Sequence, residues 1–385
     1  MLYYLHLLTD WYSPLRVFRY ITVRALGGAG TAFVLSLLLG PPLIRLLRRF
    51  KINQQIRGAD ESAILESLHG KKKGTPTMGG LLIVITVTVS VLLWGIPSNL
   101  PLLLTLATML WMAAIGFADD YLKITRRNSR GLHPRAKLLW QSVWVLLFMT
   151  ALLLIPETAA RTRQLMLPFL KDPVWTGMSL GAVFLFLWLV LAGATNAVNL
   201  TDGLDGLAIG CSNSVALAYL FMAYVAGHVQ FAEYLQVPFV AGAGELAVFC
   251  GCLLGAGLGF LWFNCHPARV FMGDTGSFAL GGAIAAVAIL VKQELALLIV
   301  GGVFVLEALS AVLQIGYFKL TRWHSGAGRR LFLCAPLHHH FEFLEKRRAK
   351  AEGRDLEVVE TMITIRFWIV SIICALLGVA TLKLR

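Results

Sequence analysis

The sequence is poor in charged residues, which make up 14% of its 385 residues, whereas 57% are hydrophobic. Soluble domains carry roughly a quarter of charged residues, so this composition excludes an ordinary water-soluble protein. Acidic residues are scarcer than basic ones: 21 Asp and Glu stand against 34 Lys and Arg, which gives a net charge of +13. Because the basic residues lie between apolar runs, we attribute their excess to anionic lipid headgroups and expect no nucleic-acid partner.

The sequence also lacks metal-binding cysteine motifs, repeats and a secretory signal. Its six cysteines have neither zinc nor redox spacing, and most lie in apolar runs, where cysteine behaves as a small hydrophobic residue. No internal repeat or low-complexity tract occurs. Met1–Arg24 lacks the order of charged, apolar and small residues that marks a secretory signal, so we expect it to stay on the protein, partly at the membrane interface.

What the sequence does contain is a series of apolar runs near the ~20 residues that cross a bilayer. Lipid offers no partners to backbone N–H and C=O groups, and no run alternates like a barrel strand, so each run is predicted to be helical. We therefore predict an all-α polytopic membrane protein that forms one domain over residues 1–385. Its ten transmembrane helices are expected near residues 25–45, 77–96, 101–118, 138–155, 176–197, 207–227, 244–262, 275–291, 295–317 and 362–381.

The basic residues indicate the orientation in the membrane. Most of them follow the first, third, fifth, seventh or ninth run, with large groups in Arg45–Lys73 and Lys319–Arg354. By the positive-inside rule these connections are cytosolic, and both termini lie on the outer, periplasmic side. The same connections hold nearly all the paired acids, histidines and glycine-rich turns. Because ionisable residues gathered at one interface usually mark a site, we predict an active site formed by cytosolic loops.

The first polar cluster stands at the end of the third run, where Asp119 and Asp120 precede Lys123 in the pattern DDxxK. If the helix continues one turn past the bilayer, spacings of three and four residues place all three side chains on one patch. Adjacent carboxylates suit a divalent cation, and an ammonium group suits phosphate oxygens. Acids that merely end a span in solvent are the alternative interpretation. The remaining motifs favour the functional one.

The connection Asn196–Gly206 carries a second cluster, with Asn199, Asp202 and Asp205 among glycines. Glycine permits tight turns and a close approach of a ligand to the backbone. The loop therefore offers an amide and two carboxylates to a ligand. An ordinary turn, which uses the same residue types, is the alternative.

The connection Phe263–Ser277 carries a third cluster and places Asp274 just before the next predicted helix. A helix N-cap is a frequent use of Asp and is the alternative role. Capping does not account for the glycines on both sides of the Asp-Thr pair, nor for Asn264 and Arg269 in the same segment. A functional site is therefore favoured here.

Two further segments are unusual for simple connections. Pro336–Glu342 contains three consecutive histidines, His338 to His340. Consecutive residues do not share one helical face, so a tri-histidine zinc site is not expected, and phosphate contact or proton handling near neutral pH suits them better. Lys71–Gly80 is a basic, glycine-flanked entry into the second run, for which a positive-inside anchor is the alternative.

Five motifs together resemble those of the phospho-N-acetylmuramoyl-pentapeptide transferases, bacterial members of the polyprenyl-phosphate N-acetylhexosamine-1-phosphate transferase superfamily. Acidic pairs recur across that superfamily, whereas the triple histidine and the GTPTMGG run are typical of the muramoyl-pentapeptide branch. The motifs are DDxxK at Asp119–Lys123, NxxNLTDGLDG at Asn196–Gly206, FMGDTGS at Phe271–Ser277, PLHHHFE at Pro336–Glu342 and KKGTPTMGG at Lys72–Gly80.

The resemblance implies a multi-pass enzyme of the bacterial plasma (inner) membrane. It implies transfer of phospho-N-acetylmuramoyl-pentapeptide from UDP-N-acetylmuramoyl-pentapeptide to undecaprenyl phosphate, with lipid I and UMP as products, magnesium as cofactor and a homodimer as the assembly. By motif, Asp274 is the metal ligand, and Asp119, Asp120, Asp274 and His338 are catalytic. The residues implied to line the nucleotide and phosphate region are Lys72, Thr77, Lys123, Asn199, Asp202, Asp205, Asn264, Phe271, Gln314 and His339.

Several alternatives stay open from the sequence. The lipid phosphate attacks the donor directly, or Asp119 or Asp120 attacks first and forms an aspartyl-phosphate. A sister transferase that uses UDP-N-acetylglucosamine is the nearest rival function. An ion-coupled transporter is a rival of another class, although transporter sites usually lie at the midplane between repeated halves, and neither repeats nor mid-span charges are evident.

Overall fold

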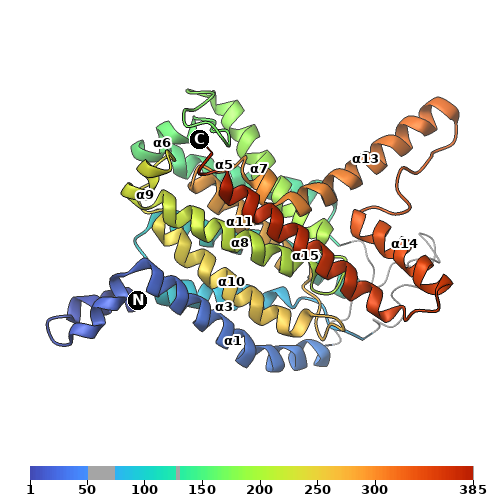
Figure 1. Ribbon diagram of the computed structural model, residues 1–385, viewed down its shortest axis with the longest axis horizontal. Helices are drawn as coiled ribbons and strands as arrows, with labels where there is room; N and C mark the ends of the chain where they lie inside the picture. Colours follow the sequence, from blue (N-terminus) through green and yellow to red (C-terminus); the bar gives the residue numbers. More distant parts are fainter. Residues whose placement is uncertain (51–73, 127–130, 385) are drawn as a thin grey trace.

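The computed structural model describes residues 1–50, 74–126 and 131–384, whose regular secondary structure is helical (Figure 1). No strand longer than an isolated bridge occurs among them, which confirms the all-α prediction. The long helices are α1 (Ile21–Arg49), α3 (Gly80–Trp94), α4 (Leu100–Thr125), α5 (Pro134–Leu153), α7 (Leu180–Thr201), α8 (Leu207–Ala226), α10 (Gly244–Asn264), α11 (Gly273–Leu290), α13 (Gly302–Ser325), α14 (Leu337–Ala351) and α15 (Glu357–Ala380). The short ones are η1 (Leu2–Leu8), η2 (Ser13–Arg19), α6 (Pro156–Thr162), α9 (Val229–Tyr234) and α12 (Leu297–Val300).

In the described part of the chain, nine helices are long and apolar enough to cross a bilayer, namely α1, α4, α5, α7, α8, α10, α11, α13 and α15. The second predicted run, 77–96, forms α3, which is apolar but has only 15 residues. A helix rises 1.5 Å per residue, so α3 alone is shorter than the ~30 Å hydrocarbon core. The nine longer helices nevertheless make the chain a multi-pass membrane protein.

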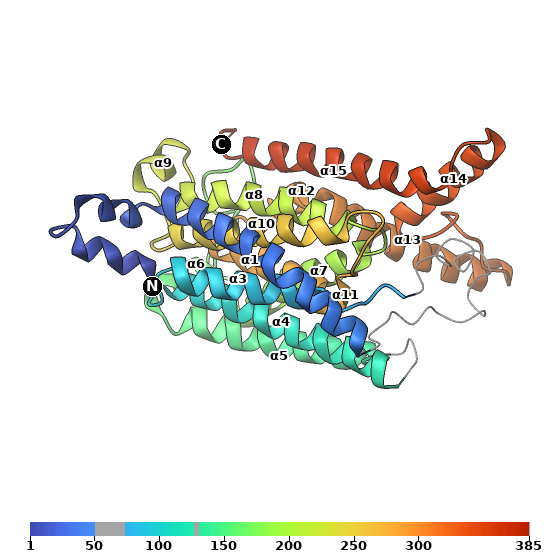
Figure 2. The ribbon, with the colours of Figure 1, turned by 90° about the horizontal axis from the view of Figure 1, so that it is seen from below.

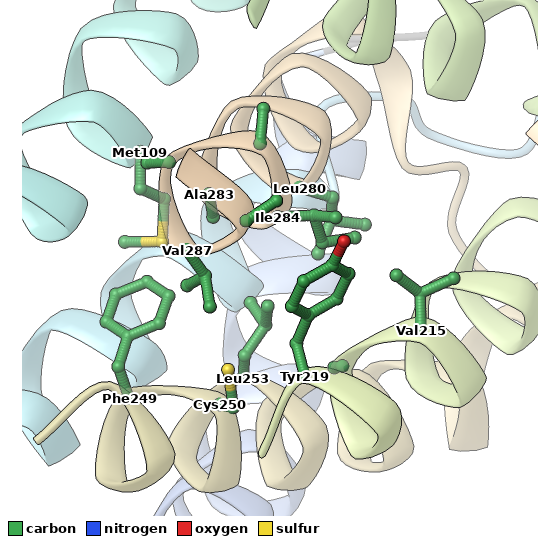
Figure 3. Close-up of a cluster of buried hydrophobic side chains, with 14 of the residues drawn as sticks. Met109, Val215, Tyr219, Phe249, Cys250, Leu253, Leu280, Ala283, Ile284 and Val287 are labelled. Atoms are coloured by element: carbon green, nitrogen blue, oxygen red, sulfur yellow. The ribbon is translucent and has the colours of Figure 1, made fainter. Parts of the chain in front are cut away.

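Helix α11 lies at the centre of the bundle. In its apolar stretch of 18 residues, 89% of the residues are buried, compared with 22% in the corresponding stretch of α13 and 28% in that of α1. Figure 3 shows why: side chains of α11 face those of α4, α8 and α10 in one apolar cluster. The cluster contains Leu280, Ala283, Ile284 and Val287 of α11 with Met109, Tyr219, Phe249 and Leu253.

Small residues let these helices approach closely, as is usual in membranes, where helix association depends on tight packing. Gly251 and Gly255 of α10 lie one turn apart and press against the backbone carbonyls of Ala25 and Ala29 in α1. A side chain at either glycine would push the two helices apart. The spacing of small residues along α10 thus fixes its contact with α1.

Both chain ends lie at the same end of the bundle, opposite α14 (Figure 2). The C-terminal part of α13 extends beyond the bundle near α14 (Figure 1). The N-terminal end of α11 and the C-terminal end of α4 face the α14 end, and the polar motifs are found there (Figure 2).

Candidate active site

Helix α4 continues through Thr125, which gives the extra turn that the DDxxK motif needed. Lys123 Nζ lies 2.6 Å from Asp119 Oδ2 and 3.9 Å from Asp120 Oδ1. The spacing of three and four residues therefore brings the three groups together as predicted. Both carboxylates are buried, with exposed side-chain fractions of 1% and 3%.

Asp274 joins this patch from α11. It is the second residue of that helix, and the N-cap is Met272, so the alternative of an Asp274 N-cap is wrong. The helix starts earlier than expected, at Gly273, whose positive φ of 74° is a conformation that glycine adopts readily. Lys123 Nζ lies 3.1 Å from Asp274 Oδ1, and oxygens of the three aspartates lie within 4.8 Å of one another.

Asp120 of α4 connects this helix to the start of α11 through hydrogen bonds. Its Oδ2 accepts hydrogen bonds from the Thr275 backbone N–H at 2.9 Å and from the Thr275 hydroxyl at 2.7 Å, and its Oδ1 accepts one from the Asp274 N–H at 3.2 Å. The first N–H groups of a helix have no partner within it and carry partial positive charge. Asp120 therefore serves as a cap supplied by another helix, and it sets the position of Asp274.

Asp119 faces α5 and the segment before it. Its Oδ1 accepts a hydrogen bond from the Leu132 N–H at 2.6 Å and lies 3.0 Å from Lys137 Nζ. Lys137 Nζ also lies 2.7 Å from Asp274 Oδ2. Lys137 was missed by sequence reasoning, because nothing in its surroundings links it to a residue 137 positions away. It bridges the two carboxylates that come from different helices.

The donor set of this cluster fits magnesium. The cluster contains three carboxylates and two ammonium groups, so it carries one excess negative charge when all five groups are ionised. Hard oxygen ligands of this kind suit Mg²⁺, which usually binds one or two carboxylates together with substrate phosphates. The lysines meanwhile suit phosphate oxygens.

Asn199 reaches the cluster from α7. Its Nδ2 donates to Asp274 Oδ1 at 3.1 Å and to Ser277 Oγ at 2.9 Å. Asn199 lies in the last helical turn rather than in the loop predicted at Asn196–Gly206, because α7 continues to Thr201, just before the first glycine of that segment. The amide therefore orients Asp274 from a rigid element.

Asp205 belongs to a second group of polar residues. Its Oδ2 accepts a hydrogen bond from the Ala268 N–H at 3.0 Å and lies 3.1 Å from His266 Nδ1, while its own N–H donates to Glu360 Oε1 at 3.0 Å. Oxygen and nitrogen atoms of Asp205, His266 and Glu360 lie within 4.8 Å of one another. The group ties the α7–α8 loop to the α10–α11 loop and to α15.

Asn264 makes a similar connection between the two loops. Its Oδ1 accepts from the Gly206 N–H at 3.1 Å, and its Nδ2 donates to the Val270 carbonyl at 2.9 Å. The next residue along, Phe271, donates its N–H to the Pro76 carbonyl at 2.8 Å. The NLTDGLDG and FMGDTGS motifs are thus joined to the GTPTMGG motif.

The three histidines contact three different partners, as expected for consecutive residues of a helix. His338 is fully buried, with Nδ1 3.1 Å from Glu307 Oε2; His339 Nδ1 lies 3.0 Å from Glu342 Oε2. His340 Nδ1 accepts from the Leu333 N–H at 3.1 Å. Burial lowers the pKa of His338 below its usual value, and Glu307 opposes that effect.

Comparisons with known proteins identify relatives along the whole chain. The model of glycosyl transferase family 4 matches residues 102–292, and phospho-N-acetylmuramoyl-pentapeptide-transferase signature 1 matches residues 72–84. Proteins with the name phospho-N-acetylmuramoyl-pentapeptide-transferase from Methylacidiphilum infernorum and Solidesulfovibrio magneticus are 48% and 49% identical, over 100% of this chain and of each relative. One from Desulfotalea psychrophila is 48% identical over 100% of this chain and 99% of its own. The chain belongs to the phospho-N-acetylmuramoyl-pentapeptide-transferase family.

The segment 102–292 that matches the glycosyl transferase model contains the whole carboxylate cluster, from Asp119 to Asp274, with Lys137. The signature at 72–84 covers Thr77, a buried residue whose hydroxyl lies against Gly273, next to Asp274. Lys72 lies outside the residues that the structure describes. The matched segments therefore surround the same end of α11.

The other implied site residues lie farther out. Gln314 of α13 accepts at Oε1 from the N–H groups of Leu331 and Phe332, at 3.0 and 2.9 Å, so it holds the α13–α14 connection. Asp202 is the C-cap of α7, in the loop that contacts His338. The residues implied to bind the substrates therefore lie on several separate elements. Sequence reasoning missed Lys137, His266, Glu307 and Glu360, which contact the residues it named.

Proposed function

We propose that the chain transfers phospho-N-acetylmuramoyl-pentapeptide from UDP-N-acetylmuramoyl-pentapeptide to undecaprenyl phosphate, giving lipid I and UMP, at a magnesium-dependent centre built from Asp119, Asp120 and Asp274. As a member of its family, the protein is a phosphoglycosyl transferase of peptidoglycan biosynthesis. The observation that best supports this centre is the convergence of three carboxylates and two lysines from α4, α5 and α11.

The proposed topology has ten crossings of the bacterial plasma (inner) membrane, with the segment 77–96, which contains α3, as the tenth, and both termini on the periplasmic side. The C-terminal end of α1 and helix α14, whose last turns are basic, lie at one end of the bundle, and both chain ends lie at the other end (Figure 2). An impermeant thiol reagent is expected to label Cys265, which is exposed at the α14 end, in inside-out vesicles only. Labelling of intact cells at Cys265 would reverse the orientation.

Helices α7 and α13 are proposed to border the path of the lipid acceptor. The two helices pack together, and α13 carries exposed apolar side chains, among them Val312, Ile315 and Leu320. The acceptor tail is confined to the bilayer and the donor is soluble. A site at the α14 end of these helices satisfies both requirements.

The metal ligands follow from the contacts of each carboxylate. Both oxygens of Asp120 accept hydrogen bonds from α11, so Asp120 is assigned to holding the site together. Asp274 is assigned as the magnesium ligand, and Asp119 lies beside it. Bound magnesium would neutralise charge on the donor diphosphate, where two anions must otherwise meet.

The reaction is proposed as a direct in-line displacement. An oxygen of the lipid phosphate attacks the phosphorus that carries the sugar, and the bond to the UMP oxygen breaks, so that UMP leaves with the electron pair. A phosphate monoester has a second pKa of ~6, so the acceptor is mostly dianionic and needs little help from a base. Asp119 orients the acceptor or takes its last proton, while Lys123 and Lys137 bind phosphate oxygens.

A UMP-release assay with purified protein in detergent tests the proposed function. With both substrates present, UMP is expected to appear with magnesium, to stop when EDTA removes the metal, and to return when magnesium is added back. UDP-N-acetylglucosamine is expected to give no product, and its preferential use would favour the sister transferase. UMP release with donor alone would contradict the direct route, and full activity in EDTA would contradict the metal centre.

The lysine that sequence reasoning missed gives a separate prediction. Lys137→Ala removes the ammonium group between Asp119 and Asp274, and kcat is expected to fall roughly 100-fold, as when other enzymes lose one group that stabilises transition-state charge. Arg135→Ala, an exposed residue in the same helical turn, serves as the control and is expected to keep wild-type kcat. Equal kcat values in the two variants would remove Lys137 from the site.

A further inference from the structure

Glu307 is a buried carboxylate that the mechanism above does not use. It lies in α13, where it is 0% exposed and is the first ionisable residue of an otherwise apolar stretch. An ionisable group inside a membrane helix is costly unless it has a specific partner, and it usually marks function. The contacts of Glu307 therefore indicate its role.

Both oxygens of Glu307 face a single residue, His338. Oε1 accepts a hydrogen bond from the His338 backbone N–H at 3.1 Å, and Oε2 lies 3.1 Å from Nδ1, at ion-pair distance without full hydrogen-bond alignment. His338 is the second residue of α14, so its N–H has no partner within that helix. Glu307 thus holds both the start of α14 and the imidazole ring.

The opposite nitrogen of the ring faces the loop between α7 and α8. His338 Nε2 has no hydrogen-bond partner in the described part of the chain, although the ring is fully buried. An added Cβ on Gly203 would collide with this nitrogen, so the ring edge lies directly against the loop that carries Asp202 and Asp205. A buried polar atom without a partner is destabilising, and a ligand that supplies the partner removes this penalty.

We propose that Glu307 is a positioning residue that fixes the orientation and the proton arrangement of His338, so that Nε2 is presented to the phosphate groups of the donor at the α7–α8 loop. This rests on the proposed function and on the catalytic role that the family resemblance implies for His338. A carboxylate beside Nδ1 keeps a proton on that nitrogen and stabilises the ring when it carries a second proton on Nε2. A protonated Nε2 donates to a phosphate oxygen.

The charge of Glu307 has a measurable consequence that simple packing lacks. The ionisable groups that face His338 are Glu307 from α13, and His339 and Glu342 from α14. Burial lowers the pKa of His338, His339 lowers it further, and the two glutamates raise it. Glu307→Gln keeps an oxygen for the His338 N–H but removes the charge, so the pKa of His338 falls and the protonated ring is retained only at lower pH.

The test compares Glu307→Gln, Glu307→Asp and a matched control in the full-length protein. Glu307→Gln is expected to lower kcat at neutral pH roughly 10- to 100-fold with KM values for both substrates little changed, by analogy with metal-binding histidines that lose their outer hydrogen-bond partner. Its activity is expected to recover partly as the pH is lowered, and Glu307→Asp, which keeps the charge, is expected to recover part of kcat. The control, Glu294→Gln, alters a buried carboxylate paired with Lys292 at 2.6 Å beyond the far end of α11 and is expected to keep kcat.

The double variant with His338→Gln separates this proposal from the proposed function. Effects that act through one residue are not additive, so Glu307→Gln is expected to add little to His338→Gln. Glu307→Gln with wild-type kcat and pH profile would overturn the positioning role. Wild-type activity in His338→Gln would instead remove His338 from the proposed function. If Glu307→Gln fails to fold, Glu307→Asp replaces it in the test: its carboxylate is shorter and withdraws from Nδ1, so kcat is expected to fall in part, and wild-type kcat in this variant overturns the role.

Discussion

Asp274→Asn is expected to reduce kcat for lipid I formation roughly 10³-fold, because the substitution removes charge from the group on which the site converges. The Asp274 carboxylate forms ion pairs with Lys123 at 3.1 Å and with Lys137 at 2.7 Å, and it accepts a hydrogen bond from the Asn199 amide at 3.1 Å. An asparagine of the same size keeps the packing of α11, but its neutral amide is a poor ligand for magnesium. The measurement is UMP release at saturating concentrations of both substrates.

Two features distinguish loss of the metal ligand from a general defect. The residual activity of Asp274→Asn is expected to rise with magnesium concentrations well above those that saturate the wild type. Asp172→Asn, an exposed aspartate outside the helices, is expected to behave as the wild type. Asp274→Asn with kcat within tenfold of the wild type would show that the metal ligand has been assigned wrongly.

Gly116→Ala is expected to lower kcat roughly 100-fold without touching any ionisable group. A Cβ at Gly116 would overlap the Asp274 carbonyl and the Thr275 Cα, and backbone atoms cannot rotate aside as a side chain can. Helices α4 and α11 must therefore separate at the point where their carboxylates meet. A displacement of about 1 Å in a catalytic site can cost 10²-fold in rate, and overpacking typically costs about 1–3 kcal/mol of stability.

The matched control for this substitution is Gly193→Ala. Gly193 is an exposed helical glycine in α7, and an added Cβ there would meet no atom within 4 Å. Because alanine favours helix over glycine, this variant is expected to be at least as stable as the wild type and fully active. UMP release and thermal unfolding measure both variants. Equal losses in the two would mean that close approach of α4 and α11 does not set the site.

The sequence by itself determined the features that depend on neighbours in the chain. Apolar runs of sufficient length gave a multi-pass helical protein, and the spacing of Asp119, Asp120 and Lys123 placed them on one patch, because helical geometry fixes which residues share a face. The motifs likewise indicated the family to which the chain belongs. Local patterns were less reliable at the ends of elements, where Asn199 proved helical and α11 proved to begin at Gly273 rather than after Asp274.

Only the tertiary structure decided which helices meet and in what register. Lys137 and Asp274 are 137 residues apart, and Glu307 and His338 are 31 apart, so no periodicity in the chain relates them. At one crossing, Gly116 of α4 allows the backbones of α4 and α11 to approach closely, which brings Asp274 beside the carboxylates of α4. The types of residue in the site are thus encoded locally, whereas their distances are set by how closely the helices pack.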